Sequence, residues 1–188
     1  MSKQRGFTLV ELVVVVAIVA ILLSIGTPSY RYITTSYRMS SEVNGLLGDL
    51  MFARSEAVKE GQFVTVCVTV NGKNCSGNTS WDRGWLVFSN PNNAPQPPGP
   101  ILRLQQKFNG RTPDSFKADN GVSSVTYNRE GFATTAAGFP NATITLHDPT
   151  ANPAWTRCLW ITPQGMLTVD SIDGAVEQVF HLTWRRCL

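Results

Sequence analysis

The stretch Leu12–Ile25 reads LVVVVAIVAILLSI, and Ser24 is its one residue that is not apolar. A helix in the core of a soluble protein needs a polar face, and this stretch offers none. The wider window Phe7–Gly26 holds about 20 residues, which at 1.5 Å per residue match the ~30 Å thickness of a bilayer's hydrocarbon core. We therefore predict a membrane-spanning helix here.

A cleaved secretory signal is the alternative interpretation, because Lys3 and Arg5 precede the apolar run. The run is longer than the usual apolar region of about 7–15 residues in such signals, and no small-x-small cleavage site followed by a polar stretch comes after it. Both observations favour a retained span. The positive-inside rule places the basic N-terminus in the cytoplasm, so the residues after the span are expected outside.

Glu11 interrupts the apolar window near its N-terminal end. An ionised carboxylate within a membrane helix costs a few kcal/mol unless it is paired, so it indicates a functional residue. The alternative is that Glu11 reaches the lipid headgroups by snorkelling, because it lies close to the basic end of the segment. A partner from another chain would satisfy the carboxylate best, since its own chain offers none in the apolar run.

The sequence Gly6-Phe7-Thr8-Leu9-Val10-Glu11 follows a short basic leader and precedes the apolar run. It resembles the class III signal of type IV pilins and type II secretion pseudopilins. The resemblance implies that a prepilin peptidase cuts after Gly6 and that Phe7 is then N-methylated. It also implies that Glu11 pairs with the N-terminal amine of a neighbouring subunit. Pro28 is expected to weaken or kink the helix, because it lacks a backbone N–H.

Beyond Pro28 the apolar spacing stays helical but becomes amphipathic, and Gly61 is a candidate C-cap. The apolar positions include Ile33, Tyr37, Val43, Leu46, Leu50, Met51, Ala57 and Val58. The period then changes to two over Phe63–Val70, which places its four valines against the helix, and Asn71-Gly72 signals a turn. Further strands are expected at Gly84–Phe88, Ile101–Phe108, Val122–Tyr127, Ala142–His147, Thr156–Thr162, Met166–Val169 and Glu177–Trp184. The stretch Asn90–Pro100 holds five of the chain's 11 prolines and indicates a surface loop.

A helix followed by strands without alternation predicts an α+β fold with an antiparallel sheet. With the pilin resemblance, this becomes the type IV pilin fold: a long N-terminal helix, membrane-spanning in its first half, packed on an antiparallel β-sheet domain. We expect a leader peptide over 1–6, a transmembrane and filament-core helix over 7–29, and a periplasmic or extracellular globular domain over 30–188.

The chain has four cysteines, all on the translocated side of the apolar segment. That side is oxidising, so disulfides are expected, and four cysteines allow three pairings. We favour Cys67–Cys75 and Cys158–Cys187. A zinc site is disfavoured because there is no CxxC spacing and neither His147 nor His181 stands at ligand spacing from a cysteine.

The resemblance extends along the chain through Ala53–Val58, Val64–Cys67 and Trp81–Phe88, and through Arg157–Thr162 with Gly165. These stretches resemble the GspH/FimT family of minor pilins and pseudopilins, most closely its FimU-like branch. The resemblance implies a low-copy subunit that helps to start a type IV pilus or a secretion pseudopilus and sits near its tip. A role in pilus-dependent motility or adhesion would follow.

The FimT branch of that family is associated with DNA binding through a late Gly-Arg-x-Arg motif. The corresponding residues here are Gly165-Met166-Leu167-Thr168, so both arginines are missing. Arg157, Arg185 and Arg186, with Trp184 beside them, are the alternative phosphate contacts. A solvated strand end explains this charge cluster better, because Asp170, Asp173 and Glu177 lie nearby in sequence. DNA is therefore a disfavoured partner, and a type II secretion pseudopilin remains a further alternative.

Charged residues make up only 15% of the chain, against about 25% in typical soluble domains. Lys3 and Arg5 supply two of the +3 net charges, so the basicity mostly reflects the leader. We expect no enzymatic activity, no catalytic residue, no metal and no cofactor. The resemblance implies other minor and major pilins, the prepilin peptidase and the inner-membrane assembly platform as partners. It also implies a single-pass inner-membrane location before assembly into a surface pilus.

Overall fold

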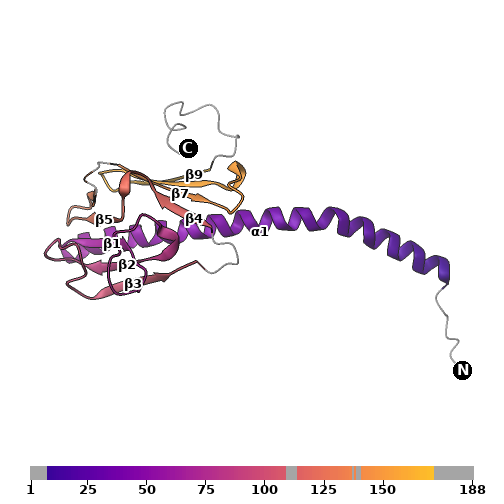
Figure 1. Cartoon of the computed structure of the whole chain (residues 1–188), viewed down its shortest axis with the longest axis horizontal. Coiled ribbons are helices and arrows are strands. Elements are labelled where there is room, and N and C mark those ends of the chain that lie inside the picture. The colour runs from indigo at the N-terminus through magenta and orange to yellow at the C-terminus, as the bar shows by residue number, and fades with distance from the viewer. Residues whose placement is uncertain (1–7, 109–113, 137, 139–140, 172–188) are drawn as a thin grey trace, which may run out of the picture. The chain divides into compact units, whose positions relative to one another are not determined.

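The computed structural model describes residues 8–108, 114–136, 138 and 141–171 (Figure 1). The chain divides into two compact units, Met1–Arg38 and Met39–Leu188. Helix α1, Leu9–Glu60, contributes to both units, and each unit is considered by itself. The prediction of one long N-terminal helix that continues beyond Pro28 is confirmed.

The N-terminal unit consists, in its described residues, of Thr8 and the first part of α1. Its apolar side chains are exposed, including Leu12 at 60% and Ile25 at 68%. The helix is long enough and apolar enough to cross a membrane. Exposing this much apolar surface to water is unfavourable, and contact with lipid or with another protein surface removes that cost. The length, the apolar composition and the exposed side chains of this helix therefore agree with the predicted membrane span.

The second unit contains two antiparallel sheets, as Figure 1 shows. The five-stranded sheet has the strand order β3-β2-β1-β5-β6. Its strands are β1 Val64–Val68, β2 Gly84–Ser89, β3 Ile101–Gln106, β5 Ser124–Tyr127 and β6 Ala133–Thr135. The four-stranded sheet has the order β4-β7-β8-β9, formed by β4 Ser115–Ala118, β7 Ala142–His147, β8 Arg157–Ile161 and β9 Leu167–Ser171. Short 3₁₀ helices occur at η1 Trp81–Arg83, η2 Asp119–Gly121 and η3 Pro153–Trp155.

The predicted strand pattern is confirmed for β1, β2, β3, β5, β7, β8 and β9, although their ends differ by a few residues. Strands β4 and β6 were missed. The first has a single large apolar side chain, Phe116, and the second reads Ala-Thr-Thr, so neither shows a strong alternation. The predicted strand Glu177–Trp184 lies outside the described residues.

The core of the second unit forms between α1 and the sheets. Buried helix residues recur every three or four positions and are Met39, Val43, Leu46, Leu50, Ala53 and Ala57. They share one apolar cluster with strand residues of both sheets, among them Val66 and Leu159. Gly61, with φ +65°, ends the helix, and the N–H of Gln62 bonds to the Ala57 carbonyl at 3.3 Å.

Three apolar positions of the second unit differ from the sequence pattern, and in the first unit Ile33 and Tyr37 are exposed as well. Met51 and Val58 were counted with the buried face of the helix but are 58% and 54% exposed. The helix presents only a narrow stripe to the sheets, and these residues lie beside it. Val70 was expected to face the helix with Val64, yet β1 ends at Val68 and Val70 is 60% exposed. The turn that follows β1 takes Val70 out of the alternation.

Candidate functional site

The first turn of α1 carries the candidate assembly residue Glu11. Its backbone N–H donates to the hydroxyl of Thr8 at 3.3 Å, which is the geometry of a threonine N-cap. The Glu11 side chain is exposed, and within the described residues it forms no ion pair. Gly6 and Phe7 lie outside the described residues. Cleavage, methylation and Glu11 pairing therefore stay predictions.

Helix α1 continues through Pro28 without a break in its helical backbone. Proline has no N–H to donate to the carbonyl one turn earlier, so this part of the ladder is weakened. Two hydroxyls also bond to carbonyls just before it: Ser24 to Ile21 and Thr27 to Leu23, both at 2.7 Å. Such side-chain bonds often accompany bends in helices. The kink at Pro28 itself stays a prediction.

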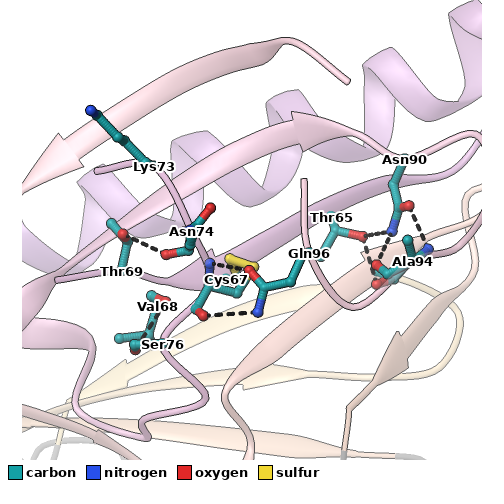
Figure 2. Close-up of a disulfide and its surroundings, with 12 residues drawn as sticks. Thr65, Cys67, Val68, Thr69, Lys73, Asn74, Ser76, Asn90, Ala94 and Gln96 are labelled. Carbon is teal, nitrogen blue, oxygen red and sulfur yellow. Dashed lines mark hydrogen bonds between the residues drawn. A yellow bond between two sulfur atoms is a disulfide. The ribbon is translucent and has the colours of Figure 1, made fainter. Parts of the chain in front are cut away.

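The Cys67–Cys75 disulfide is present, as predicted, with its Cα atoms 5.6 Å apart (Figure 2). Cys67 lies on β1, and Cys75 follows the turn that Asn71-Gly72 signalled. In that turn Asn71 Oδ1 accepts the N–H groups of Lys73 and Asn74, and Gly72 adopts φ +69°. The disulfide therefore closes a short, hydrogen-bonded loop onto the sheet.

The proline-rich connection between β2 and β3, residues 90–100, is anchored at two points (Figure 2). Asn90 is 1% exposed, and its side-chain amide donates to Thr65 Oγ1 and to the Ala94 carbonyl, both at 2.9 Å. Gln96 accepts the Cys75 N–H at 3.0 Å and donates to the Cys75 carbonyl at 3.1 Å. The sequence indicated a surface loop but not these anchors. The one available sign in the sequence was that Asn90 and Gln96, whose amide groups can both donate and accept hydrogen bonds, lie among the prolines.

Arg54 connects α1 to two distant turns. Its Nε donates to the Gly131 carbonyl at 3.1 Å, while Nη1 and Nη2 donate to the carbonyls of Gly165 and Gln164 at 3.1 and 3.0 Å. Gly165 has φ +71°, and a Cβ there would collide with the Gly131 oxygen. Arg54 and Gly165, both within stretches that carried the family resemblance, therefore form one structural contact. That role was missed because contacts distant in sequence leave no local pattern.

Tyr127 lies on β5 and is fully buried. Its hydroxyl has no hydrogen-bond partner among the residues that the structure describes. Burial raises the pKa of the Tyr127 phenol well above its usual range, and the Arg54 charge opposes this only in part. The phenol is therefore neutral in the folded chain near neutral pH.

Of the residues named as DNA contacts, Arg157 lies within the described part of the chain. Arg157 begins β8, is 8% exposed, and donates through Nη1 to the carbonyls of Ala154 and Thr156 at 3.0 and 3.1 Å. This burial argues against a contact between Arg157 and DNA phosphates. Trp184, Arg185 and Arg186 lie outside the described residues. So does Cys187, and the Cys158–Cys187 pairing stays a prediction.

Among the described residues, no group of three or more His, Cys, Asp or Glu side chains is placed to hold a metal ion. His147 Nδ1 lies 3.1 Å from the Thr156 hydroxyl, while His181 is outside the described part of the chain. The absence of an enzymatic activity, a metal and a cofactor stays a prediction. The candidate functional features that the structure describes are therefore the apolar helix, the disulfide and the anchored loop.

Two family models match the chain. The model described as type II transport protein GspH matches residues 42–165, more than half of the sequence. The chain belongs to the GspH family. The prokaryotic N-terminal methylation motif matches residues 1–27, which include Gly6, Phe7 and Glu11. The chain is thus a type IV minor pilin or pseudopilin of the GspH/FimT family.

Individual relatives agree with this assignment. The prepilin peptidase-dependent protein D of Escherichia coli K12 is 64% identical over 31 residues, 16% of this chain and 21% of that protein. A fimbrial protein of Pseudomonas aeruginosa is 36% identical over 69 residues, 37% of this chain and 44% of that protein. The type IV major alpha-pilin of Moraxella bovis is 41% identical over 63 residues, 33% and 38% of the two chains. The GspH-family chain matches less than half the length of each of these curated relatives.

The fold is also found in a solved structure. The crystal structure of the Pseudomonas aeruginosa type IV minor pilin FimU covers 72% of this chain and 90% of its own, with a TM-score of 0.56 and 19% identity. At this identity the match shows the fold alone. The prediction of the type IV pilin fold, a long N-terminal helix packed on antiparallel sheets, is confirmed.

Proposed function

We propose that this protein is a minor pilin that primes the assembly of a type IV pilus and sits at or near its tip. The observation that carries the proposal is the presence of an N-terminal methylation motif and a GspH domain in one chain, joined by the single helix α1. The fold it shares with the minor pilin FimU supports a pilus role. Pilus-dependent motility or adhesion would depend on that assembly.

In this proposal the chain has three parts. Residues 1–6 are a leader that a prepilin peptidase removes after Gly6, residues 7–29 form the membrane and filament-core helix, and residues 30–188 form the exposed domain. Before assembly the protein is held in the bacterial inner membrane with its N-terminus in the cytoplasm, and it then joins other minor and major pilins through the assembly platform. The exposed apolar side chains of α1 supply the surface for both environments.

Glu11 is the proposed pairing residue. Cleavage after Gly6 creates a cationic amine on Phe7, near the same end of the helix as Glu11. In a low-dielectric environment an unpaired carboxylate is strongly disfavoured, so a neighbouring subunit's amine stabilises the assembled arrangement. Pairing then selects subunits that are already processed, because an uncleaved chain has no amine at this position.

The test is genetic. Deleting the gene should reduce surface piliation, the unaltered gene should restore it, and Glu11→Ala should not. Glu130→Ala is the matched control, because Glu130 is an exposed carboxylate of the second unit and should restore piliation fully. Pili should be counted by electron microscopy, with immunoblots of membranes to confirm that each variant accumulates. Normal piliation in the deletion strain would refute the assembly role.

The family model's description as a type II transport protein favours one second candidate, a pseudopilin of type II secretion. Both machines would use the same helix and the same Glu11 pairing. The deletion strain separates them, since a pseudopilin predicts loss of exported enzymes from the medium with piliation unchanged. A pilus subunit predicts the opposite pair of results.

A further inference from the structure

The outer face of the five-stranded sheet is covered although it does not face α1. Cys67, Leu86 and Phe88 are each 0% exposed and form a cluster separate from the main core, with Cys75 packed against it. In the β1–β2 register Cys67 lies opposite Leu86, and Thr65 lies opposite Phe88. Directly opposed residues in an antiparallel pair share a face. Thr65 therefore belongs to the same outer face as the cluster.

The segments hydrogen-bonded over this face are Cys75 and the loop 90–100. Asn90 and Ala94 lie beside Thr65, and Gln96 lies beside the disulfide (Figure 2). One end of the loop is thus fixed directly to β1 through Asn90. The other anchor, Gln96, forms hydrogen bonds only with the Cys75 backbone among the described residues, and Cys75 is bonded to β1 through the disulfide. The connection from Gln96 to the sheet therefore passes through Cys75, which is held by the Cys67–Cys75 bond and by the next residue, Ser76, whose N–H and hydroxyl donate to the Val68 carbonyl at 2.8 and 3.1 Å.

We propose that the Cys67–Cys75 disulfide is a redox-controlled clasp for the loop 90–100. In the oxidised chain Cys75 is held on the sheet, and its N–H and C=O present a paired donor and acceptor to the Gln96 amide. In the reduced chain only hydrogen bonds hold residues 69–76, chiefly those from Ser76 to the Val68 carbonyl, so this segment opens more often and Gln96 then loses both hydrogen bonds. The loop then stays attached at Asn90 and at Pro100, whose carbonyl accepts the Ser89 N–H at 3.3 Å, and the Leu86 and Phe88 side chains gain access to water.

The opening reaction is thiol–disulfide exchange with a dithiol. Cys67 is fully buried, whereas Cys75 is partly exposed, so the reductant's thiolate approaches Cys75 Sγ. The Sγ–Sγ bond breaks, Cys67 leaves as a thiolate and is protonated, and a mixed disulfide forms on Cys75. The reductant's second thiol then displaces Cys75. Two electrons and two protons pass to the cysteines, and the dithiol becomes a cyclic disulfide.

The clasp is tested by hydrogen exchange of the backbone amide at position 75, which donates directly to Gln96. The full chain in detergent micelles is compared with Gln96→Ala, with Cys67→Ala plus Cys75→Ala, and with all three changes combined. We expect each of the first two variants to exchange at least about five-fold faster than the parent, since net hydrogen bonds are modest. The combined variant should exchange no faster than the double cysteine variant, because the two changes remove the same connection.

Matched controls separate the clasp from general loosening. Lys73→Ala alters an exposed side chain in the same short loop and should leave the amide at position 75 unchanged. The amide of Val66 in β1 should keep its protection in every variant. Treating the parent with dithiothreitol should reproduce the double cysteine variant, and the same treatment of that variant should change nothing further. This last comparison removes any contribution from Cys158 and Cys187.

A second readout reports the covered face. An apolar dye whose fluorescence rises on exposed hydrophobic surface should respond to reduction and to the double cysteine variant, but not to Lys73→Ala. Exchange at position 75 within two-fold of the parent after loss of the disulfide would overturn the proposal. So would full additivity of the Gln96 and cysteine effects, because independent anchors would then hold the loop.

Discussion

The two faces of the five-stranded sheet are held by different forces. The inner face buries Val64, Val66 and Val68 against α1 in a large apolar cluster that reaches both sheets. The outer face buries only a small cluster around Cys67, and its cover is held by a disulfide and amide hydrogen bonds. Apolar burial scales with area, so the inner face should dominate folding stability. The outer face should instead control local order in the loops.

The largest expected effect comes from breaking the inner face. Leu46 is fully buried on α1, within the main cluster. Leu46→Ala should lower the free energy of unfolding by about 2–5 kcal/mol, because it removes transfer energy and leaves a cavity. The measurement is guanidinium unfolding of the full chain in detergent micelles, followed by fluorescence of the buried Trp81 and Trp85.

Val70→Ala is the control for that measurement. Val70 is apolar and close to β1 in sequence but 60% exposed, so its truncation should cost less than about 0.5 kcal/mol. Equal losses from Leu46→Ala and Val70→Ala would contradict the assignment of the helix-facing core as the main source of stability.

A smaller effect is expected from breaking the outer face. The Cys67–Cys75 bond closes a loop with a sequence separation of 8. In the chain-entropy model, removing such a short cross-link costs about 2.5 kcal/mol. Cys67→Ala plus Cys75→Ala should therefore lower the unfolding free energy by roughly that amount while the chain still folds. Near-UV circular dichroism of the tryptophans should keep its native shape, and its loss would show that the disulfide is required for the inner core as well.

Segments of the fold with a clear local pattern could be predicted from the sequence, and segments held by tertiary contacts could not. Leu12–Ile25 and the valines of β1 repeat with periods that define a membrane helix and a strand, so local pattern was sufficient there. Strand β6, Ala133–Thr135, is fixed by pairing with β5 and has no pattern of its own. Tertiary contact determines such segments, and a single sequence does not contain that contact explicitly.

In the candidate site, too, the features formed by residues near one another in sequence were predicted, and those formed by distant residues were not. The motif around Glu11 and the nearby pair Cys67 and Cys75 are local in sequence and were identified from it. The bonds from Gln96 to Cys75 and from Arg54 to Gly165 join residues 21 and 111 positions apart. Nothing in the residue types distinguishes such partners from solvent-exposed polar groups. The outer face was therefore predicted less completely than the inner one.

The smallest expected change in stability comes from a substitution on the inner face, Tyr127→Phe. Tyr127 is buried in the main cluster, and its hydroxyl finds no hydrogen-bond partner within the described part of the chain. Tyr127→Phe removes a buried polar group and keeps the ring, so stability at pH 7 should stay unchanged or rise by about 1 kcal/mol. Guanidinium unfolding of the two proteins at matched detergent concentration measures the difference.

The pH dependence of that difference identifies its cause. Burial raises the pKa of Tyr127 in the folded chain, whereas in the unfolded chain the phenol titrates near its ordinary value of about 10. The folded state therefore retains a proton that the unfolded state loses, and the parent loses stability as pH rises above about 10. Tyr127→Phe removes this loss, so its advantage over the parent should grow between about pH 9 and 11. A constant difference across that range would mean that the folded phenol ionises as readily as a solvated one, and that water reaches the inner face at β5.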